Sequence, residues 1–361
     1  MAALNIFEPQ MSRVVSGMEG KSILIYGPNR SGKTSNIARA PKPLFLSFEK
    51  GLNAINDVPY FYIDKWQKFV TLTKQLCDPT KLEETQKVYK TIVIDTIQGI
   101  TDLADEYICN VFGIKSIGDG HDGFGCWKEF EKEMGAPIKS LCGAGYTMVF
   151  IGHEMDRVLS KANGKDKVTQ LYPKTGDAKR CTAIICDLCD IIAYAQTQPC
   201  TPDGQEVLST LYLKGTPAFY AGSRFKGIAS SIPSWDWDKL VEAVDSAIKQ
   251  EEADSGTKAT TFKKQQAAEE TLAKQAIEAD KKDLGALVEE IGAMLTWMNT
   301  NEGSVETYNK MKKDINCPNF LVTSVNETSS EEDKNRLIYL HGQLVEKGYY
   351  EKAGLNNGAN G

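Results

Sequence analysis

The sequence predicts an α/β fold with a mainly parallel sheet, followed by a charged linker and a small helical C-terminal region. Three observations lead to this prediction. Short apolar runs recur along the first part of the chain, helical stretches lie between several of them, and a glycine-rich segment follows the first run. Continuous apolar runs are typical of strands buried on both faces, and strand–helix alternation favours parallel pairing.

The apolar runs define the expected strands of the core. They cover residues 22–26, 44–48, 91–94, 147–151 and 191–194. Helical stretches are expected at 100–111 and 127–142. Later in the chain, residues 208–213 and 218–225 are predicted to form a hairpin, with Gly215, Thr216 and Pro217 as the turn.

The composition changes after residue 249. Residues 250–283 are rich in Glu, Lys, Gln and Ala, which predicts a solvated helix or a flexible linker. An amphipathic helix is expected next, with an apolar face formed by Leu284, Leu287, Val288, Ile291, Met294 and Leu295. The sequence therefore divides into a core at 1–249, a linker at 250–283 and a helical region at 284–361.

A second C-terminal helix is expected to begin near Thr328. Thr328 and Glu331 have the spacing of a capping box, in which each side chain satisfies a backbone N–H group of the first turn. This helix would carry Leu337, Ile338, Leu340, Leu344 and Val345. The polar tail at 356–361 is expected to be disordered.

Charge and hydropathy restrict the setting and the partners. The formal net charge of -6 argues against a broad DNA-coating surface, although a local basic loop can still bind DNA. No apolar run approaches the ~20 residues that span a bilayer. The first ten residues lack the basic and apolar regions of a signal peptide. We therefore expect a cytoplasmic protein without a membrane partner.

The cysteines are expected to be reduced thiols. There are nine of them, an odd number in a chain without a secretion signal. Cys181, Cys186, Cys189 and Cys200 form the one pattern that resembles a zinc site. The Cys186–Cys189 pair lies inside an apolar run and no second pair of this spacing follows. Buried thiols are therefore favoured, and zinc is not expected.

A phosphate-binding loop follows the first predicted strand. Gly27-Pro28-Asn29-Arg30-Ser31-Gly32-Lys33-Thr34 fits the pattern G-x-x-x-x-G-K-[ST], between a strand and a helix start. The glycines allow backbone N–H groups to point at phosphate oxygens. Lys33 is expected to reach the β- and γ-phosphates and the Thr34 hydroxyl to ligate magnesium. The sequence thus predicts a P-loop NTPase with ATP and Mg²⁺ as cofactors.

Two carboxylates and a histidine lie at the ends of three predicted strands. Asp95 is expected to complete the magnesium site, but Thr96 follows it, so a tandem acidic pair is missing. Glu49 is the other candidate for activating water, provided that its strand neighbours the phosphate-loop strand; otherwise it is an exposed strand-end carboxylate. His153 could contact the γ-phosphate or simply be hydrogen-bonded at a strand end. His121 and His341 offer no comparable context.

The order of these motifs resembles that of RecA-like P-loop ATPases of bacteriophages, including their single-strand annealing recombinases. The resemblance rests on the phosphate loop, residues 49–52, residues 94–96, Trp127 and residues 151–153, and covers roughly 22–240. It implies a RecA-like core in which Glu49 is the catalytic base and His153 senses the γ-phosphate; RecA itself has Gln there. It also implies ATP hydrolysis in phage recombination or replication, inside a bacterial host.

The same resemblance implies that neighbouring subunits share the ATP site. RecA-like enzymes complete the site with a basic residue from a neighbour, and Arg224 and Lys226 resemble such a pair. This predicts a homo-oligomer, with cations that stabilise charge on the γ-phosphate. The alternative is a solvated basic strand edge.

A long irregular stretch at 154–180 is the predicted contact for single-stranded DNA. It is locally basic, with Arg157, Lys161, Lys165, Lys167, Lys174, Lys179 and Arg180 against Glu154, Asp156, Asp166 and Asp177. Its one aromatic side chain for base stacking is Tyr172. Residues 113–125, with Phe124, form a second candidate loop. The competing hypothesis is an ATPase that contacts protein partners through its C-terminal helices and ignores DNA.

Overall fold

The computed structural model describes residues 11–123, 125–160, 167–174, 179–197, 209–303, 305–314, 318–326 and 328–355. Its contacts separate a compact unit, Ser12–Gln265, from a second one that comprises Met1–Met11 and Gln266–Gly361. The first unit contains the sheet and the second contains helices. The three-part division inferred from the sequence, with boundaries after residues 249 and 283, stays a prediction.

The sheet of the first unit is mainly parallel, which confirms the predicted α/β fold. Neighbouring strands follow the order β10-β8-β7-β1-β5-β4-β2-β3. The pairs from β7 to β3 are parallel. These strands are β1 (Ser22–Gly27), β2 (Pro43–Ser47), β3 (Tyr60–Tyr62), β4 (Thr91–Asp95), β5 (Thr147–Ser160) and β7 (Ile191–Gln196). The five strands expected from apolar runs are all present.

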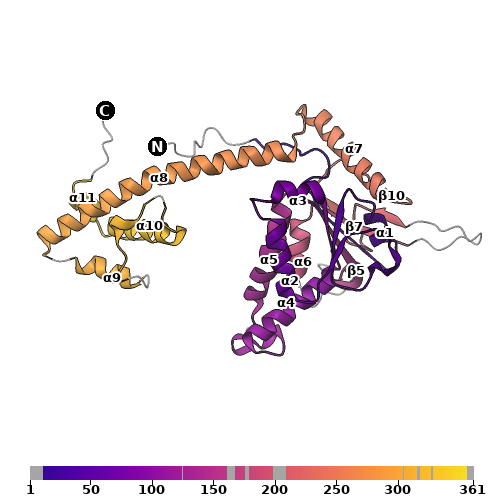
Figure 1. Cartoon of the computed structure of the whole chain (residues 1–361), viewed down its shortest axis with the longest axis horizontal. Helices are drawn as coiled ribbons and strands as arrows, with labels where there is room; N and C mark the ends of the chain where they lie inside the picture. Colours follow the sequence, from indigo (N-terminus) through magenta and orange to yellow (C-terminus); the bar gives the residue numbers. More distant parts are fainter. Residues whose placement is uncertain are drawn as a thin grey trace, which may run out of the picture. The chain divides into compact units, whose positions relative to one another are not determined.

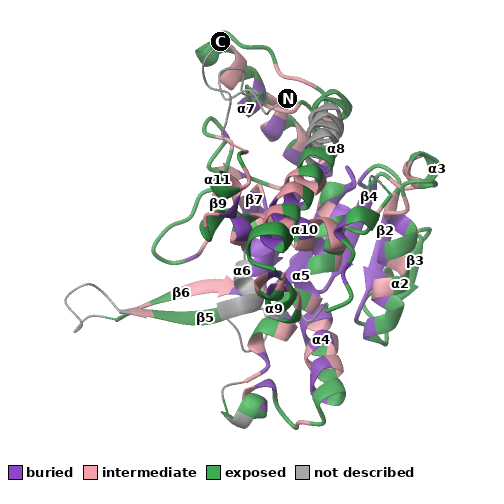
Figure 2. Cartoon of the chain, turned by 90° about the vertical axis from the view of Figure 1, so that its left-hand side faces the viewer, coloured by how far each residue is buried: buried purple, intermediate pink, exposed green. Residues whose placement is uncertain are grey.

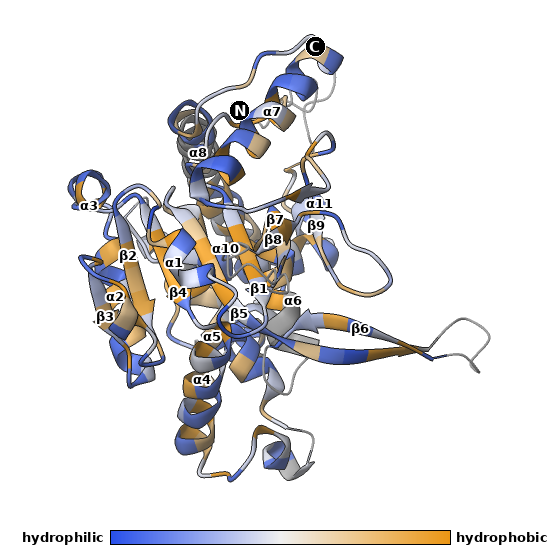
Figure 3. Ribbon diagram, turned by 90° about the vertical axis from the view of Figure 1, so that its right-hand side faces the viewer, coloured by the Kyte–Doolittle hydropathy of each residue, from blue (hydrophilic) through white to orange (hydrophobic). Residues whose placement is uncertain are grey.

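Helices cover both faces of this sheet, because its central strands are apolar on both sides. Leu24 and Ile94 face a core with α2 (Trp66–Leu76), α4 (Ile97–Phe112), α5 (Trp127–Gly143) and α6 (Lys179–Leu188). Ile25 and Val93 face a second core with α1 (Lys33–Ile37) and α7 (Trp237–Ser255). Figure 1 shows these two helical layers, and Figure 3 shows the hydrophobic strands between them. A shorter helix, α3 (Leu82–Val88), precedes β4.

The stretch after the fourth predicted strand is a hairpin over its described part, so the expected irregular loop is wrong there. β5 continues to Ser160 and pairs antiparallel with β6 (Lys167–Pro173), from Glu154↔Pro173 to Ser160↔Lys167. Figure 2 shows the two strands projecting from the body of the unit. The reason is backbone pairing: an exposed two-stranded ribbon needs no apolar run to form its hydrogen bonds.

The predicted late hairpin between 208–213 and 218–225 is also wrong for the described residues. β8 (Thr210–Tyr212) pairs with β7 and with β10 (Ser231–Ile232), whereas β9 (Gly222–Ser223) pairs with the start of β7. A small turn does form, in which Thr216 bonds to Phe219. The strands before and after this turn, β8 and β9, pair with different parts of β7. They can do so because the edge of β7 that faces away from β1 is available for pairing along its whole length.

The second unit is a helical cluster. The expected apolar face lies on α8 (Phe262–Asn301), which begins before the predicted helix start, and Leu284, Ile291 and Met294 are buried. They pack with α9 (Glu306–Asp314), η4 (Val322–Ser324), α10 (Glu331–Glu346) and α11 (Tyr349–Lys352). The expected cap at Thr328 is wrong, because Ser330 accepts the bond from the Asp333 N–H group. None of the helices described is long and apolar enough to cross a membrane.

Candidate functional site

The carboxyl ends of the central strands gather the predicted site residues at one edge of the sheet. Gly27 on β1 lies opposite His153 on β5, and Ser47 on β2 lies opposite Asp95 on β4. Glu49 follows β2 by two residues. The expectation that its strand neighbours the phosphate-loop strand is wrong, because β4 and β5 lie between β2 and β1, but Glu49 still ends at the same edge of the sheet. Ligands of open α/β sheets bind at this edge. The parallel register thus brings together side chains that lie far apart in the sequence.

Glycine is required at both ends of the phosphate loop. Gly27 has φ 155°, and a Cβ atom there would lie 2.2 Å from the carbonyl oxygen of Ala195 on β7. Gly32 has φ 76°, in the left-handed region, as does Arg30 with φ 63°. The loop curls around its own lysine, whose Nζ donates to the carbonyls of Gly27 (3.0 Å) and Pro28 (2.7 Å) and to the Ser31 hydroxyl.

A series of hydrogen bonds from segments distant in the sequence stabilises the phosphate loop. The Ser209 hydroxyl donates to the Ser31 carbonyl (2.7 Å), and Trp235 Nε1 donates to Ser209 Oγ (2.8 Å). Asn36 Nδ2 in turn donates to the Trp235 carbonyl at 3.0 Å. These supporting residues carry no motif, so sequence reasoning missed them; a buried serine–tryptophan pair is visible only once the fold is known.

The residues assigned to magnesium-bound triphosphate fit that ligand. Thr34 Oγ1 lies 3.3 Å from Asp95 Oδ2, so one hydroxyl and one carboxylate converge beside the loop. Burial raises the pKa of Asp95 to about 6. Burial also lowers the pKa of Lys33 to about 8, against the attraction of Asp95 and Glu154. A bound cation would favour the ionised form of Asp95, and bound phosphates would favour the charged form of Lys33.

Glu49 and His153 lie together next to Asp95. Thr96 Oγ1 donates to Glu49 Oε1 at 2.6 Å, and His153 Nε2 lies 3.7 Å from Glu49 Oε2. The His153 ring holds the pKa of the Glu49 carboxyl below its usual value, aided by the Thr96 hydroxyl and opposed by partial burial. His153 Nδ1 is buried and has no hydrogen-bond partner among the residues that the structure describes. The carboxylate is thus ionised and held in place, as a general base requires.

The hairpin is anchored directly at this site. The Lys174 N–H group donates to the His153 carbonyl (2.8 Å), and the positive charge of Lys174 also lowers the pKa of Glu49. The Tyr26 hydroxyl, next to Gly27, lies within hydrogen-bond distance of two carbonyls, that of Tyr220 and that of Leu171 on β6, the latter at 3.1 Å. The Tyr194 hydroxyl on β7 donates to Glu154 Oε2 at 3.0 Å. Thr96, noted from the sequence only as part of the 94–96 motif, and Lys174, predicted from the sequence to contact DNA, are therefore further members of the site.

Arg224 and Lys226 lie at the opposite, amino-terminal edge of the sheet. Arg224 bonds to Asp190 at 3.2 Å and to the Asp187 carbonyl at 2.6 Å, and Asp190 directly precedes β7. Both basic residues line a cavity of about 610 Å³ there. They cannot act on the phosphate loop of their own chain. Their assignment to a neighbour's site stays a prediction.

Part of the predicted DNA contact lies outside the described residues. This applies to Phe124, Lys161, Lys165, Asp166 and Asp177, and to the side chains of Lys179 and Arg180. The same holds for Cys200 and the Cys181 side chain, so the four-cysteine pattern cannot be compared with a zinc geometry. Cys186 and Cys189 are free and buried, as expected for core thiols.

Comparison with known proteins agrees with this geometry. Residues 19–225 match the profile of a family described as AAA domain, a segment that contains the phosphate loop, Asp95 and the hairpin. The chain is 35% identical over 309 residues to the SPbeta prophage-derived uncharacterized protein YorG of Bacillus subtilis (strain 168). That alignment covers 86% of this chain and 89% of the relative. The predicted P-loop class is confirmed, while the finer likeness to annealing recombinases stays a prediction.

Proposed function

The chain belongs to the AAA domain family of P-loop ATPases, and we propose that it hydrolyses ATP with Mg²⁺ and uses the reaction to control binding of single-stranded DNA. The observation that carries this proposal is the junction at His153, where the Glu49 carboxylate and the root of an exposed hairpin meet. The prophage origin of the relative supports a role in phage recombination or replication, within an infected bacterial cell.

Each residue of the site has a distinct part in hydrolysis. The loop N–H groups and Lys33 bind the phosphates, and Thr34 with Asp95 holds the cation, which neutralises phosphate charge. Glu49 accepts the proton of the attacking water, since it is ionised and fixed by Thr96. His153 donates toward the γ-phosphate when it releases Glu49. The position of each side chain beside the phosphate loop supports these assignments.

The hairpin supplies the surface for DNA. Arg157 lies over the ring of Tyr172 at 4.6 Å, so a cation and an aromatic ring share one face of the ribbon. Met155 and Val158 are exposed apolar side chains on β5, with 40% and 59% of their surface accessible. Stacking rings, cations and apolar contacts are what sequence-independent strand binding uses. A local surface of this kind is compatible with an acidic protein.

His153 couples the ATP site to the hairpin, because it lies where the two regions meet. A shift of the His153 ring between Glu49 and a phosphate would move a backbone that bonds to Lys174, at the end of β6. Tyr26 and Tyr194 tie the same end of the hairpin to β1 and β7. In many nucleotide-driven proteins, a segment that contacts the γ-phosphate changes its arrangement when the phosphate is lost. The end of the hairpin at His153 would act as such a segment.

We also propose a homo-oligomer with a shared ATP site. Arg224 and Lys226 lie at the edge of the sheet opposite the phosphate loop, so a head-to-tail contact brings them to a neighbour's nucleotide. The Arg224 side chain is 60% exposed despite its bond to Asp190. Mixing Lys33→Ala subunits with Arg224→Ala subunits should restore activity at interfaces that combine both intact residues. If the mixture recovers no ATPase activity and the protein has a monomeric mass in the presence of ATP, the ATP site is not shared between subunits.

The test of the proposed function is the rate of ATP hydrolysis with and without a single-stranded oligonucleotide. We expect the oligonucleotide to change the turnover of the full chain. A second candidate, action on protein partners, is favoured by the exposed Ile338 and Tyr339 on α10. That alternative predicts ATP turnover that DNA leaves unchanged. Absence of any turnover would refute both.

A further inference from the structure

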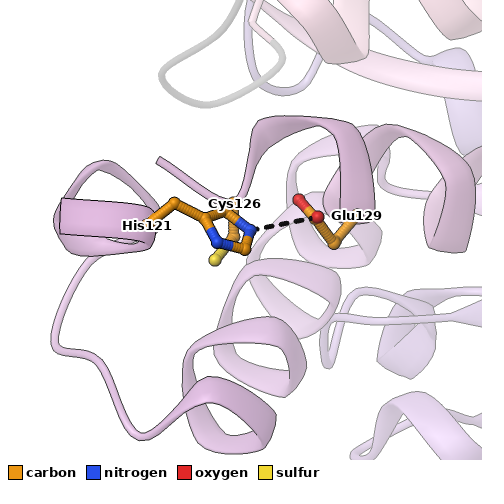
Figure 4. Close-up of side chains that lie close together, drawn as sticks. All are labelled: His121, Cys126 and Glu129. Carbon is orange, nitrogen blue, oxygen red and sulfur yellow. Dashed lines mark hydrogen bonds and ion pairs between the residues drawn. The ribbon is translucent and has the colours of Figure 1, made fainter. Parts of the chain in front are cut away.

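Between α4 and α5, a compact loop brings together three side chains that commonly bind metals. His121 lies in the 3₁₀ turn η3 (His121–Gly123), Cys126 directly precedes α5, and Glu129 lies in its first turn. One nitrogen, sulfur and oxygen atom from these residues all lie within 4.8 Å of one another. Figure 4 shows the three side chains pointing toward one another. It is the one such group among the residues described.

The loop is built so that the thiol and the imidazole meet. A Cβ atom on Gly120 would lie 2.2 Å from Cys126 Sγ, so only glycine allows the backbone to pass this close to the thiol. The Gly125 N–H group donates to the Gly120 carbonyl (2.7 Å) and the Cys126 N–H group to the Ile117 carbonyl (2.9 Å). These bonds close the loop into a fixed cradle around the sulfur.

His121 takes an unusual conformation to face this cradle. Its φ is 49°, in the left-handed region, which a non-glycine residue adopts only at an energetic cost. Its ring packs edge-on against Phe112 at a centroid distance of 5.8 Å. Its Nε2 atom lies 3.1 Å from Glu129 Oε1. Strain held at a cluster of polar side chains is a common mark of a binding site.

We propose that His121, Cys126 and Glu129 bind a Zn²⁺ ion, with water as the fourth ligand. Imidazole nitrogen, thiolate sulfur and carboxylate oxygen are the zinc ligands of proteins, whereas Mg²⁺ and Ca²⁺ prefer oxygen alone. Tetrahedral ligands at 2.0–2.3 Å from zinc lie about 3.3–3.8 Å apart. The side chains need to close by only about 1 Å from their present separations to reach this geometry.

The three side chains differ in burial in a way that leaves the cluster accessible to an ion from solvent. Cys126 is fully buried and forms the floor, whereas the His121 and Glu129 side chains are 51% and 37% exposed at the rim. A bound ion would cross-link the loop to the first turn of α5. These residues follow the far end of α4, which begins beside Asp95 and spans sixteen residues. The zinc site is therefore independent of the ATP site and of its proposed function.

The experiment measures Zn²⁺ binding by the full chain after removal of metals with a chelator. Competition with a chromophoric chelator gives the affinity, and we expect one ion per chain. Glu129→Gln and His121→Gln keep their size and lie at the surface, so they should fold. Each should weaken binding by at least about 10-fold, the loss that even a residue outside the ligand set can cause. Zinc should also raise the thermal midpoint of the wild-type chain.

His341→Gln is the matched control. His341 also pairs with a glutamate, Glu290, at 2.7 Å, but belongs to no three-residue metal group among the described residues. Its substitution should leave zinc binding unchanged. Co²⁺ should give a thiolate charge-transfer absorption that is lost in Cys126→Ser and kept in Cys77→Ser. No retained zinc, or equal affinity in the wild type and both rim variants, would overturn the proposal.

Discussion

The phosphate loop and the β5–β6 hairpin meet at His153, yet they are built in opposite ways. The loop is closed on itself around a buried Lys33, which is hydrogen-bonded to the loop carbonyls, and Ser209 donates a further bond to the loop. The described part of the hairpin is a two-stranded ribbon whose Met155 and Val158 face solvent. One region is fixed by many internal bonds, whereas the other is held mainly at its root.

This contrast separates what each region can do. A loop fixed by internal hydrogen bonds offers one arrangement of donors, which suits a ligand of defined shape such as a triphosphate. An exposed ribbon offers backbone pairing and a mixed surface, which suits an extended partner of variable sequence. Strand β5 belongs to both, because its first half lies in the sheet and its second half forms the ribbon. Substitutions in the two regions should therefore affect different measurements.

The largest expected effect is on hydrolysis. Glu49→Gln keeps the shape of the side chain but cannot accept a proton, so turnover should fall about 10²–10⁴-fold while ATP still binds. Asp95→Asn should instead weaken the dependence on Mg²⁺. Steady-state ATPase assays and nucleotide titrations distinguish the two variants. Near-normal turnover of Glu49→Gln would place the base elsewhere.

Nucleotide affinity should depend most on Lys33. Lys33→Ala removes a charged donor, and each hydrogen bond from a charged group contributes about 1.5–3 kcal/mol, or roughly 10- to 150-fold in affinity. Calorimetric titration with Mg-ATP measures this loss, and circular dichroism checks the fold. The control is Lys68→Ala, which removes an exposed lysine paired with Asp64. Unchanged binding by Lys33→Ala would refute the phosphate-loop assignment.

A smaller effect is expected from pH. The pKa of Lys33 is about 8 in the free protein, and bound phosphates favour its charged form. Affinity should be nearly constant between about pH 6 and pH 7 and fall about 10-fold between pH 7 and pH 9, because the nucleotide must then bind together with a proton. Titrations across this range measure the step. Lys33→Arg keeps its positive charge throughout this range, so its affinity should not fall between pH 7 and pH 9. A constant affinity of the wild-type chain across the same range would contradict the lowered pKa.

The smallest effect is expected in the hairpin. Arg157→Ala removes the cation beside Tyr172, which we expect to contact a DNA base. One exposed cation–π contact with a base is worth about 0.5–1 kcal/mol, so DNA affinity should fall roughly 2- to 5-fold. ATP affinity should not change. Fluorescence anisotropy with a labelled single strand measures the loss, which should be smaller at high salt. An equal loss of ATP affinity would erase the distinction between the two regions.

The same contrast explains what could be predicted from the sequence. The central strands and the phosphate loop were predictable because continuous apolar runs and a fixed glycine spacing are local signals. The hairpin was not, since Glu154, Asp156 and Arg157 give its strand the composition of a loop. The Ser209–Trp235 support and the Glu49–Thr96 bond depend on strand order, which joins residues distant in sequence.

The most direct test of the account is the affinity for single-stranded DNA in two nucleotide states. The full chain is titrated onto a labelled oligonucleotide with Mg²⁺ and either a non-hydrolysable ATP analogue or ADP. We predict tighter binding with the analogue, by at least about 5-fold, the lower range of allosteric coupling. His153→Ala should keep the ADP-state affinity and lose this gain. Equal affinity in both states for the wild-type chain would contradict coupling between the phosphate site and the hairpin.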